Sequence, residues 1–290
     1  MITIENRQLK CGFKIPVFGL GTWMMGGDFK RQPDNNGDAD AAALAAGLDL
    51  GLTHIDTAEM YAAGFTEEIV GRAIAGRKRN ELFITTKVWK TNLSYDGVMR
   101  AAEGSLTRLG TDYIDLYLVH LPNDKFPLEG TIQALDRLKD EKRVLHIGVS
   151  NFAVRRLEHA QALSRYKIVV NQVHYNLVFR EAEKSGLLDY CQRHDVILMA
   201  WRPLQKGALL ENSGKVLDSV CRQYGKTPAQ IAINWLISQP NIVTISTMRS
   251  RKHLDDNMGA LGWRMDSKDI KLLREQFPGQ ANVSDIVPLS

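Results

Sequence analysis

Three short segments bring together four ionisable side chains of the kinds that transfer protons. The segments read His54-Ile-Asp-Thr-Ala-Glu-Met-Tyr61, Ile84-Thr-Thr-Lys87-Val and Leu116-Tyr-Leu-Val-His120. Each places an ionisable residue at or just past the end of an apolar, β-forming run, and the runs lie about 30 residues apart. Strand ends at this spacing lie side by side in a parallel α/β sheet, so we expect the side chains to meet in one pocket. Asp56, Tyr61, Lys87 and His120 would then form a proton-transfer site.

Reduction of a carbonyl group by hydride is a reaction that suits these four residue types. The oxygen that becomes an alcohol needs a proton, and a tyrosine donates poorly unless a nearby cation stabilises its phenolate. Lys87 supplies that cation, Asp56 keeps Lys87 charged and in place, and His120 orients the carbonyl by a hydrogen bond. Taken singly, each residue also fits a structural role, as an ion pair, a packing aromatic or a core histidine. Their joint occurrence at successive strand ends favours catalysis.

Eight strand-like apolar runs with helical segments between them organise the chain. The runs lie at 17–20, 53–55, 82–86, 114–119, 144–149, 168–173, 196–200 and 242–245. Helical periodicity marks the intervening stretches, as in the stripe Val98, Ala102, Leu106 and Leu109. Helix starts are indicated at Ser94 and at Thr227-Pro228. Eight strand–helix units in about 250 residues predict a (β/α)8 TIM barrel.

The ends of the chain fit one barrel domain spanning 1–290. The first 16 residues resemble a β-hairpin, with arms at 2–5 and 11–14, that would cap the bottom of the barrel. A doubly wound open sheet is the alternative, and it would be favoured by a Gly-x-Gly-x-x-Gly turn after the first strand. The nearest string, Gly19-Leu-Gly21-Thr-Trp-Met, lacks the third glycine.

Composition narrows the class of protein and its partners. The chain has 290 residues, 44% hydrophobic and 24% charged, with a formal net charge of +4. Its basic residues are scattered, which disfavours nucleic-acid binding. The three cysteines, Cys11, Cys191 and Cys221, are widely spaced and odd in number, as is typical of reduced thiols in a cytosol. Without a signal peptide or a long apolar run, we expect a cytoplasmic protein that binds no membrane, acts as a monomer and carries no metal.

The chain resembles the aldo-keto reductase family, in its bacterial form with a short C-terminal tail, over almost its whole length. The strings that carry the resemblance are Gly19-Leu-Gly-Thr22-Trp23, the Asp56–Tyr61 segment, Thr86-Lys87-Val-Trp89, Asp115-Leu-Tyr-Leu-Val-His120, Ile147-Gly-Val-Ser-Asn151-Phe and Asn171-Gln172-Val. The family's catalytic tetrad matches Asp56, Tyr61, Lys87 and His120. His120 also argues against the family's double-bond reductases, which carry a glutamate there.

The resemblance implies a nicotinamide dinucleotide, NADPH, with NADH as the alternative, bound across the barrel mouth. It places Ser150, Asn151 and Gln172 on the carboxamide and Trp201, where the family usually has tyrosine, on the nicotinamide ring. The other cofactor-binding residues that it implies are Thr22, Trp23, Asp56, Leu204, Met248, Arg249, His253, Asp256 and Asn257. In this last group, Arg249 is expected to take the 2′-phosphate, because His253 stands where many members carry an arginine.

The implied substrate is a small carbonyl compound. Trp23 and Trp89 fall at positions that line the substrate pocket, with Tyr61 and His120 at its floor. Aromatic walls favour an apolar or planar aldehyde or ketone. Because the chain lacks the long tail of many eukaryotic members, we expect an open pocket walled by 121–130 and 202–215.

Two other functions stay open at this point. His54-x-Asp56 on one strand, with His120 and His146 elsewhere, could begin the metal site of a barrel hydrolase. A non-catalytic protein that holds the cofactor as a regulatory ligand is the second alternative, although the intact tetrad disfavours it.

Overall fold

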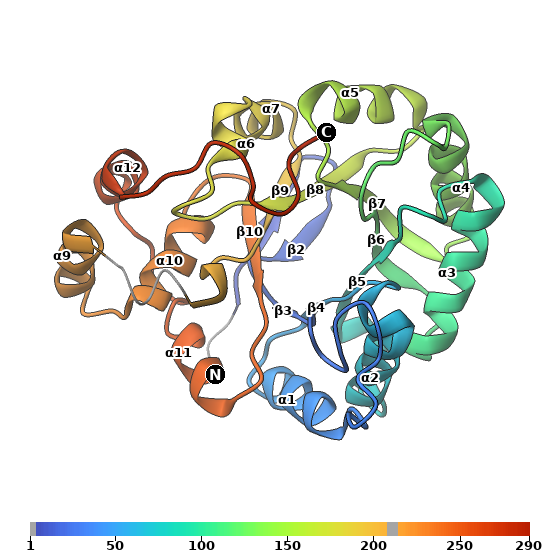
Figure 1. Cartoon of the computed structure of the whole chain (residues 1–290), viewed down its shortest axis with the longest axis horizontal. Helices are drawn as coiled ribbons and strands as arrows, with labels where there is room; N and C mark the ends of the chain where they lie inside the picture. The colour runs from blue at the N-terminus through green and yellow to red at the C-terminus, as the bar shows by residue number, and fades with distance from the viewer. Residues whose placement is uncertain (1–3, 208–213) are drawn as a thin grey trace.

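A closed barrel of eight parallel strands surrounded by helices forms the fold (Figure 1). The computed structural model describes residues 4–207 and 214–290. The barrel strands are β3 (Phe18–Gly21), β4 (His54–Asp56), β5 (Phe83–Val88), β6 (Ile114–Val119), β7 (Val144–Ser150), β8 (Ile168–His174), β9 (Ile197–Trp201) and β10 (Ile242–Ser246). Strand β10 pairs with both β9 and β3, which closes the barrel. Each predicted run overlaps one strand, so the predicted (β/α)8 fold is confirmed and the open sheet is wrong.

Helices between the strands form the outer ring. They are α1 (Asp38–Asp49), α2 (Phe65–Ile74), α3 (Tyr95–Leu109), α4 (Leu128–Asp140), α5 (Val154–Leu163), α6 (Glu181–Lys184), α7 (Leu187–Arg193), α9 (Gly214–Tyr224), α10 (Pro228–Ile237), α11 (Arg251–Met258) and α12 (Ser267–Gln276), with short 3-10 turns η1 (Tyr61–Gly64), η2 (Arg79–Glu81) and η3 (Gln205–Gly207). Both predicted helix starts are confirmed. The Ser94 hydroxyl caps α3, and Thr227 forms a reciprocal capping box with Gln230 at α10. Within the described ranges, no helix combines the length and apolar character needed to cross a bilayer.

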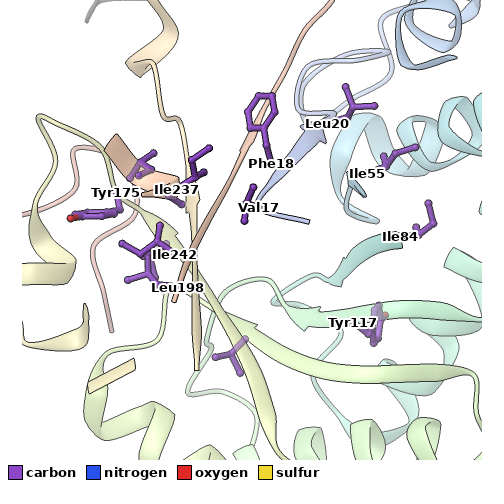
Figure 2. Close-up of a cluster of buried hydrophobic side chains, with 14 of the residues drawn as sticks. Val17, Phe18, Leu20, Ile55, Ile84, Tyr117, Tyr175, Leu198, Ile237 and Ile242 are labelled. Carbon is purple, nitrogen blue, oxygen red and sulfur yellow. The ribbon is translucent and has the colours of Figure 1, made fainter. Parts of the chain in front are cut away.

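The barrel strands bury side chains on both faces, because successive residues of a strand point to opposite sides. On β6, Leu116 and Leu118 belong to an inner cluster inside the barrel, whereas Tyr117 and Val119 belong to an outer cluster. Figure 2 shows other members of the outer cluster, among them Ile55. Two apolar layers therefore hold each strand in place.

A hairpin closes the N-terminal end of the barrel. Its strands are β1 (Asn6–Gln8) and β2 (Lys14–Pro16), and Phe13 packs edge-on against Phe83 and His146 at 6.0 and 4.7 Å between ring centroids. The predicted hairpin is confirmed, but its predicted arms at 2–5 and 11–14 are wrong in register. The Leu9 amide donates to the Phe13 carbonyl, and so the turn occupies the residues expected to be the second arm. Residues 1–3 lie outside the described ranges.

The substitution Phe13→Ala tests whether this hairpin stabilises the barrel. The Phe13 side chain is 1% exposed, so we expect Phe13→Ala to lower the free energy of unfolding by about 3–5 kcal/mol. Urea denaturation measures the change. The exposed Lys10 in the same turn supplies the control, and Lys10→Ala should shift stability by less than about 0.5 kcal/mol. Equal losses in the two variants would show that the hairpin does not plug the core.

Candidate active site

The four predicted catalytic residues come together at the carboxyl ends of β4, β5 and β6. Asp56 ends β4, Lys87 is the penultimate residue of β5, and His120 follows the last residue of β6. Tyr61 opens the turn η1, whose next two residues adopt left-handed backbone conformations. That turn folds the chain back over the strand ends and brings the phenol to the lysine.

The ammonium of Lys87 is the centre of this group. Its Nζ lies 2.6 Å from Asp56 Oδ1, 2.7 Å from the Thr57 carbonyl oxygen and 3.4 Å from Tyr61 Oη. Lys87 is fully buried and Asp56 is 1% exposed. Asp56 Oδ2 accepts a second hydrogen bond, at 2.7 Å, from Gln172 Nε2 on β8. All three ammonium protons have acceptors, as a buried charge requires.

The shifts in pKa follow from burial and from this ion pair. Burial alone would lower the pKa of Lys87, but Asp56 and Tyr61 raise it above its ordinary value, so the lysine stays charged. Burial raises the pKa of Tyr61, Lys87 opposes the rise and Asp56 adds to it. We expected Lys87 to favour the phenolate; it acts in that direction, but burial outweighs it. The phenol therefore keeps its proton at neutral pH until a reaction removes it.

His120 faces Tyr61 across the pocket, with 5.7 Å between ring centroids. Burial and the Lys87 charge hold the pKa of His120 well below its usual range. The ring is therefore neutral at pH 7 and has a single N–H to donate. A neutral imidazole beside the phenol suits the orientation of a carbonyl oxygen better than its protonation.

Aromatic rings contact Tyr61 and His120. Trp23 lies 4.9 Å from Tyr61 and Trp89 lies 5.0 Å from His120, both edge to face. Phe29 joins the two indoles, at 5.6 Å from Trp23 and 6.4 Å from Trp89, and is 58% exposed. The sequence analysis missed Phe29, since it lies in an irregular loop and has no motif or periodicity to mark it.

A polar trio continues the site toward β7 and β8. The Ser150 hydroxyl donates to the Gln172 carbonyl oxygen at 2.8 Å, and Asn151 Nδ2 donates to Ser150 Oγ at 2.8 Å. Trp201, at the end of β9, directs its Nε1 to Asn151 Oδ1 at 3.4 Å. Through Gln172, the trio is hydrogen-bonded to Asp56. Amide and hydroxyl groups beside an indole can bind a carboxamide attached to a flat ring, as in nicotinamide.

A second group of predicted residues lies at the start of α11. Ser250 caps this helix by accepting from the His253 amide at 3.2 Å. Its free N-terminal amides, with the exposed Arg251, suit a phosphate. Arg249 donates to the Asp40 carboxylate, with Nε 3.0 Å from Oδ1, and to the Met24 carbonyl. The arginine expected at the 2′-phosphate is thus bonded to α1 and to the loop that precedes it.

Other predicted cofactor residues are partly engaged within the protein. Asp256 Oδ1 accepts from Thr227 and Gln230 of α10, at 2.9 and 3.0 Å. Asn257 is buried and lies 3.4 Å from the Ser246 hydroxyl. The Thr22 hydroxyl donates to the Asp56 carbonyl at 2.9 Å. Two more predicted residues, Leu204 and Met248, are half-buried and buried, respectively.

The C-terminal residues of the chain lie at the barrel mouth. Residues 281–290 return to the barrel mouth, where the Ser290 amide donates to the Asn151 carbonyl at 3.2 Å (Figure 1). An open pocket walled by 121–130 and 202–215 stays a prediction. Within the second of these walls, residues 208–213 lie outside the described ranges.

The geometry does not assemble the proposed metal site. His54, the first residue of β4, is fully buried below the mouth, with Nε2 3.0 Å from Thr85 Oγ1. His120 lies beyond the opposite end of β6, which is separated from β4 by β5. In the described part of the chain, no three His, Cys, Asp or Glu residues are grouped to hold a metal ion.

Comparisons with known proteins agree with this geometry. The model of the Aldo/keto reductase family matches residues 17–276. Methylglyoxal reductase YeaE of Escherichia coli (strain K12) is 34% identical over 275 residues, 93% of this chain and 94% of its own length. The structure of the thermostable aldo-keto reductase Tm1743 with the inhibitor epalrestat has a TM-score of 0.90 at 39% identity, covering 93% of this chain and 99% of its own. The structure of an aldo-keto reductase from Klebsiella pneumoniae in complex with NADPH has a TM-score of 0.84 at 33% identity. The match covers 97% of this chain and 98% of that one.

The buried ion pair predicts a pH-dependent loss of stability when its cation is removed. In Lys87→Met the Asp56 carboxylate is buried without a counter-charge, and we expect a loss of about 3–5 kcal/mol at pH 7. Burial then places the folded-state pKa of Asp56 above its unfolded value. A carboxyl shifted in this direction contributes stability at low pH that is lost as pH rises, so the deficit should shrink by about pH 5.

Urea denaturation of Lys87→Met at both pH values measures this effect. The matched control is the double variant Lys87→Met/Asp56→Asn, which removes the charge and should recover most of the loss at pH 7. A double variant as unstable as the single one would show that the unpaired charge is not the cause.

Proposed function

Because this chain belongs to the aldo/keto reductase family, we propose that it reduces aldehydes and ketones to alcohols with NADPH. The observation that carries the proposal is the Lys87 ammonium, 2.6 Å from Asp56 and 3.4 Å from the phenol of Tyr61 at the barrel mouth. This arrangement holds a protonated phenol beside a permanent positive charge. It suits a reaction in which the phenol must lose its proton to a nearby oxygen.

Each residue of the tetrad has a separate role in this proposal. Bound NADPH supplies the hydride that adds to the carbonyl carbon. Tyr61 gives its proton to the carbonyl oxygen, so that the alcohol forms without a free alkoxide. Lys87 stabilises the resulting phenolate until solvent returns a proton, and Asp56 keeps Lys87 charged. His120, neutral by burial, donates a hydrogen bond that orients the carbonyl.

Two groups of residues at the mouth would hold the cofactor. Ser150, Asn151 and Gln172 would bind its carboxamide and Trp201 would stack on its nicotinamide ring, since these four residues form one hydrogen-bonded set next to the tetrad. Arg249 and the start of α11 hold the phosphates at the other end. The arginine favours NADPH over NADH, because only NADPH has a 2′-phosphate.

The substrate that fits the pocket is a small aldehyde or ketone with a planar or apolar body. Trp23, Trp89 and the newly found Phe29 enclose the space above Tyr61 with aromatic edges. Methylglyoxal is a reasonable first probe, given the activity in the name of the Escherichia coli relative. An aromatic aldehyde is the second, because its ring would pack against the indoles.

Tyr61→Phe tests the proton donor. The substitution removes one hydroxyl and keeps the ring contacts with Trp23, so we expect kcat for methylglyoxal and benzaldehyde to fall by about 10²–10⁴-fold. NADPH oxidation followed at 340 nm measures the rate, and NADPH affinity should stay within about twofold. Tyr95→Phe, on the exposed start of α3, is the control and should retain wild-type turnover. Full turnover by Tyr61→Phe would overturn the assignment.

Arg249→Ala tests the cofactor preference. A charge-assisted hydrogen bond contributes about 1.5–3 kcal/mol, so we expect the Kd for NADPH to rise by about 10- to 100-fold and that for NADH to change little. Fluorescence titration of both cofactors gives the constants. Arg193→Ala is the matched control, since this exposed arginine is paired with Asp189 on α7, outside the proposed phosphate site. If the NADPH constant is unchanged in Arg249→Ala, the assignment of this arginine is wrong.

A further inference from the structure

Trp201 rests on a second ring that the sequence analysis did not identify. The imidazole of His174, the last residue of β8, lies parallel to the indole, with centroids 4.2 Å apart and 9° between the planes. Phe179 stacks on the other face of the imidazole at 4.3 Å and 24°. The indole therefore has a flat, buried support on one side.

Hydrogen bonds at both nitrogens fix the plane of this imidazole. Burial lowers the pKa of His174 to about 4, so the ring is neutral at pH 7 and has one N–H. Nε2 lies 3.0 Å from Gln205 Oε1, which accepts, and Nδ1 lies 2.8 Å from the Ser284 hydroxyl, which donates. Asn176 Nδ2 also donates to Gln205 Oε1, at 3.1 Å, consistent with this assignment.

The segment 284–290 that holds His174 also reaches Asn151. The Glu181 carboxylate accepts from the amides of Ser284 and Leu289, at 2.9 and 3.1 Å, and so ties the segment to α6. Beyond this anchor, Ser290 donates to the Asn151 carbonyl at 3.2 Å. In Figure 1 the dark red end of the chain crosses from α12 to a point beside α5. The segment 284–290 therefore contacts both Asn151 and His174, the residue on which Trp201 stacks.

We propose that His174, held by the segment 284–290, is a positioning residue that sets the plane of Trp201 for stacking on the nicotinamide ring. The inference rests on the proposed function, in which the nicotinamide ring stacks on the indole of Trp201. We call this indole the shelf, and the imidazole of His174 behind it the brace. An indole braced from behind has lost its rotational freedom before the cofactor arrives, so binding does not need to order it. Without the imidazole, the side chain would have to be ordered by the cofactor itself, at a cost in affinity.

Comparing NADPH with adenosine 2′,5′-bisphosphate separates positioning from general stability. The bisphosphate carries the adenosine and 2′-phosphate groups of NADPH but has no nicotinamide ring, so the shelf contributes nothing to its binding. Loss of a brace should therefore weaken NADPH alone. Loss of folded protein would reduce the active fraction for both ligands equally.

His174→Ala is the main variant, with isothermal titration calorimetry as the measurement. We expect the Kd for NADPH to rise by about 3- to 10-fold, the range that the energy of one aromatic stack allows. The Kd for the bisphosphate should stay within about twofold, and so should KM for the carbonyl substrate. The control is Val283→Ala, whose side chain is 55% exposed; it should change neither constant.

Two further variants make each result decisive. Ser284→Ala keeps the stacked ring and removes the hydroxyl that donates to it and that also accepts from the amides of Ile286 and Val287; a rise of about twofold for NADPH alone supports the brace even if His174→Ala does not fold. Trp201→Ala examines the shelf itself. If it leaves the ratio of the two constants unchanged, the shelf of the proposed function is wrong and the inference falls with it. If Trp201→Ala changes the ratio but neither His174→Ala nor Ser284→Ala does, the shelf stands and the brace is overturned.

Discussion

The ion pair between Lys87 and Asp56 is the interaction on which the site depends. Two charges removed from water destabilise a protein unless each finds a complete set of partners. Here the partners come from separate elements: the Thr57 carbonyl after β4, the phenol in η1 and the Gln172 amide on β8. These elements meet only when the barrel is closed. The pair therefore links the chemistry to the fold as a whole.

Apolar side chains fill the barrel below this ion pair. The hairpin residue Phe13 closes the N-terminal end, and inward-facing leucines such as Leu116 and Leu118 fill the middle. At the carboxyl ends of the strands the interior carries the charged pair and its hydrogen-bond partners. Burial on one side and an aromatic rim on the other keep water from most of the ionisable groups. This exclusion raises the pKa of Tyr61 and lowers that of His120.

Sequence reasoning was most successful where the information is local. Strand runs, helix caps and the residue types at strand ends are set by neighbours in the chain, and for this reason all eight strands and the meeting of the tetrad could be predicted. The hairpin register could not, because the Leu9–Phe13 turn competes with an extended arm of similar composition. Contacts between distant residues were also missed. His174 is 110 positions from Ser284, and no periodicity in the sequence indicates that the two side chains are in contact.

The residues of the site are also held in place in two different ways. The tetrad is held by strands that the barrel fixes on both faces, so its geometry varies little without loss of the fold. The proposed cofactor residues are supported differently: Arg249, in the loop before α11, pairs with Asp40 of α1, and Trp201 stacks on His174, which the segment 284–290 contacts. Substitutions in loops are tolerated more readily than those in barrel strands. The aromatic rim and Arg249 lie in loops and can therefore vary more readily than Asp56 and Lys87, which lie on barrel strands.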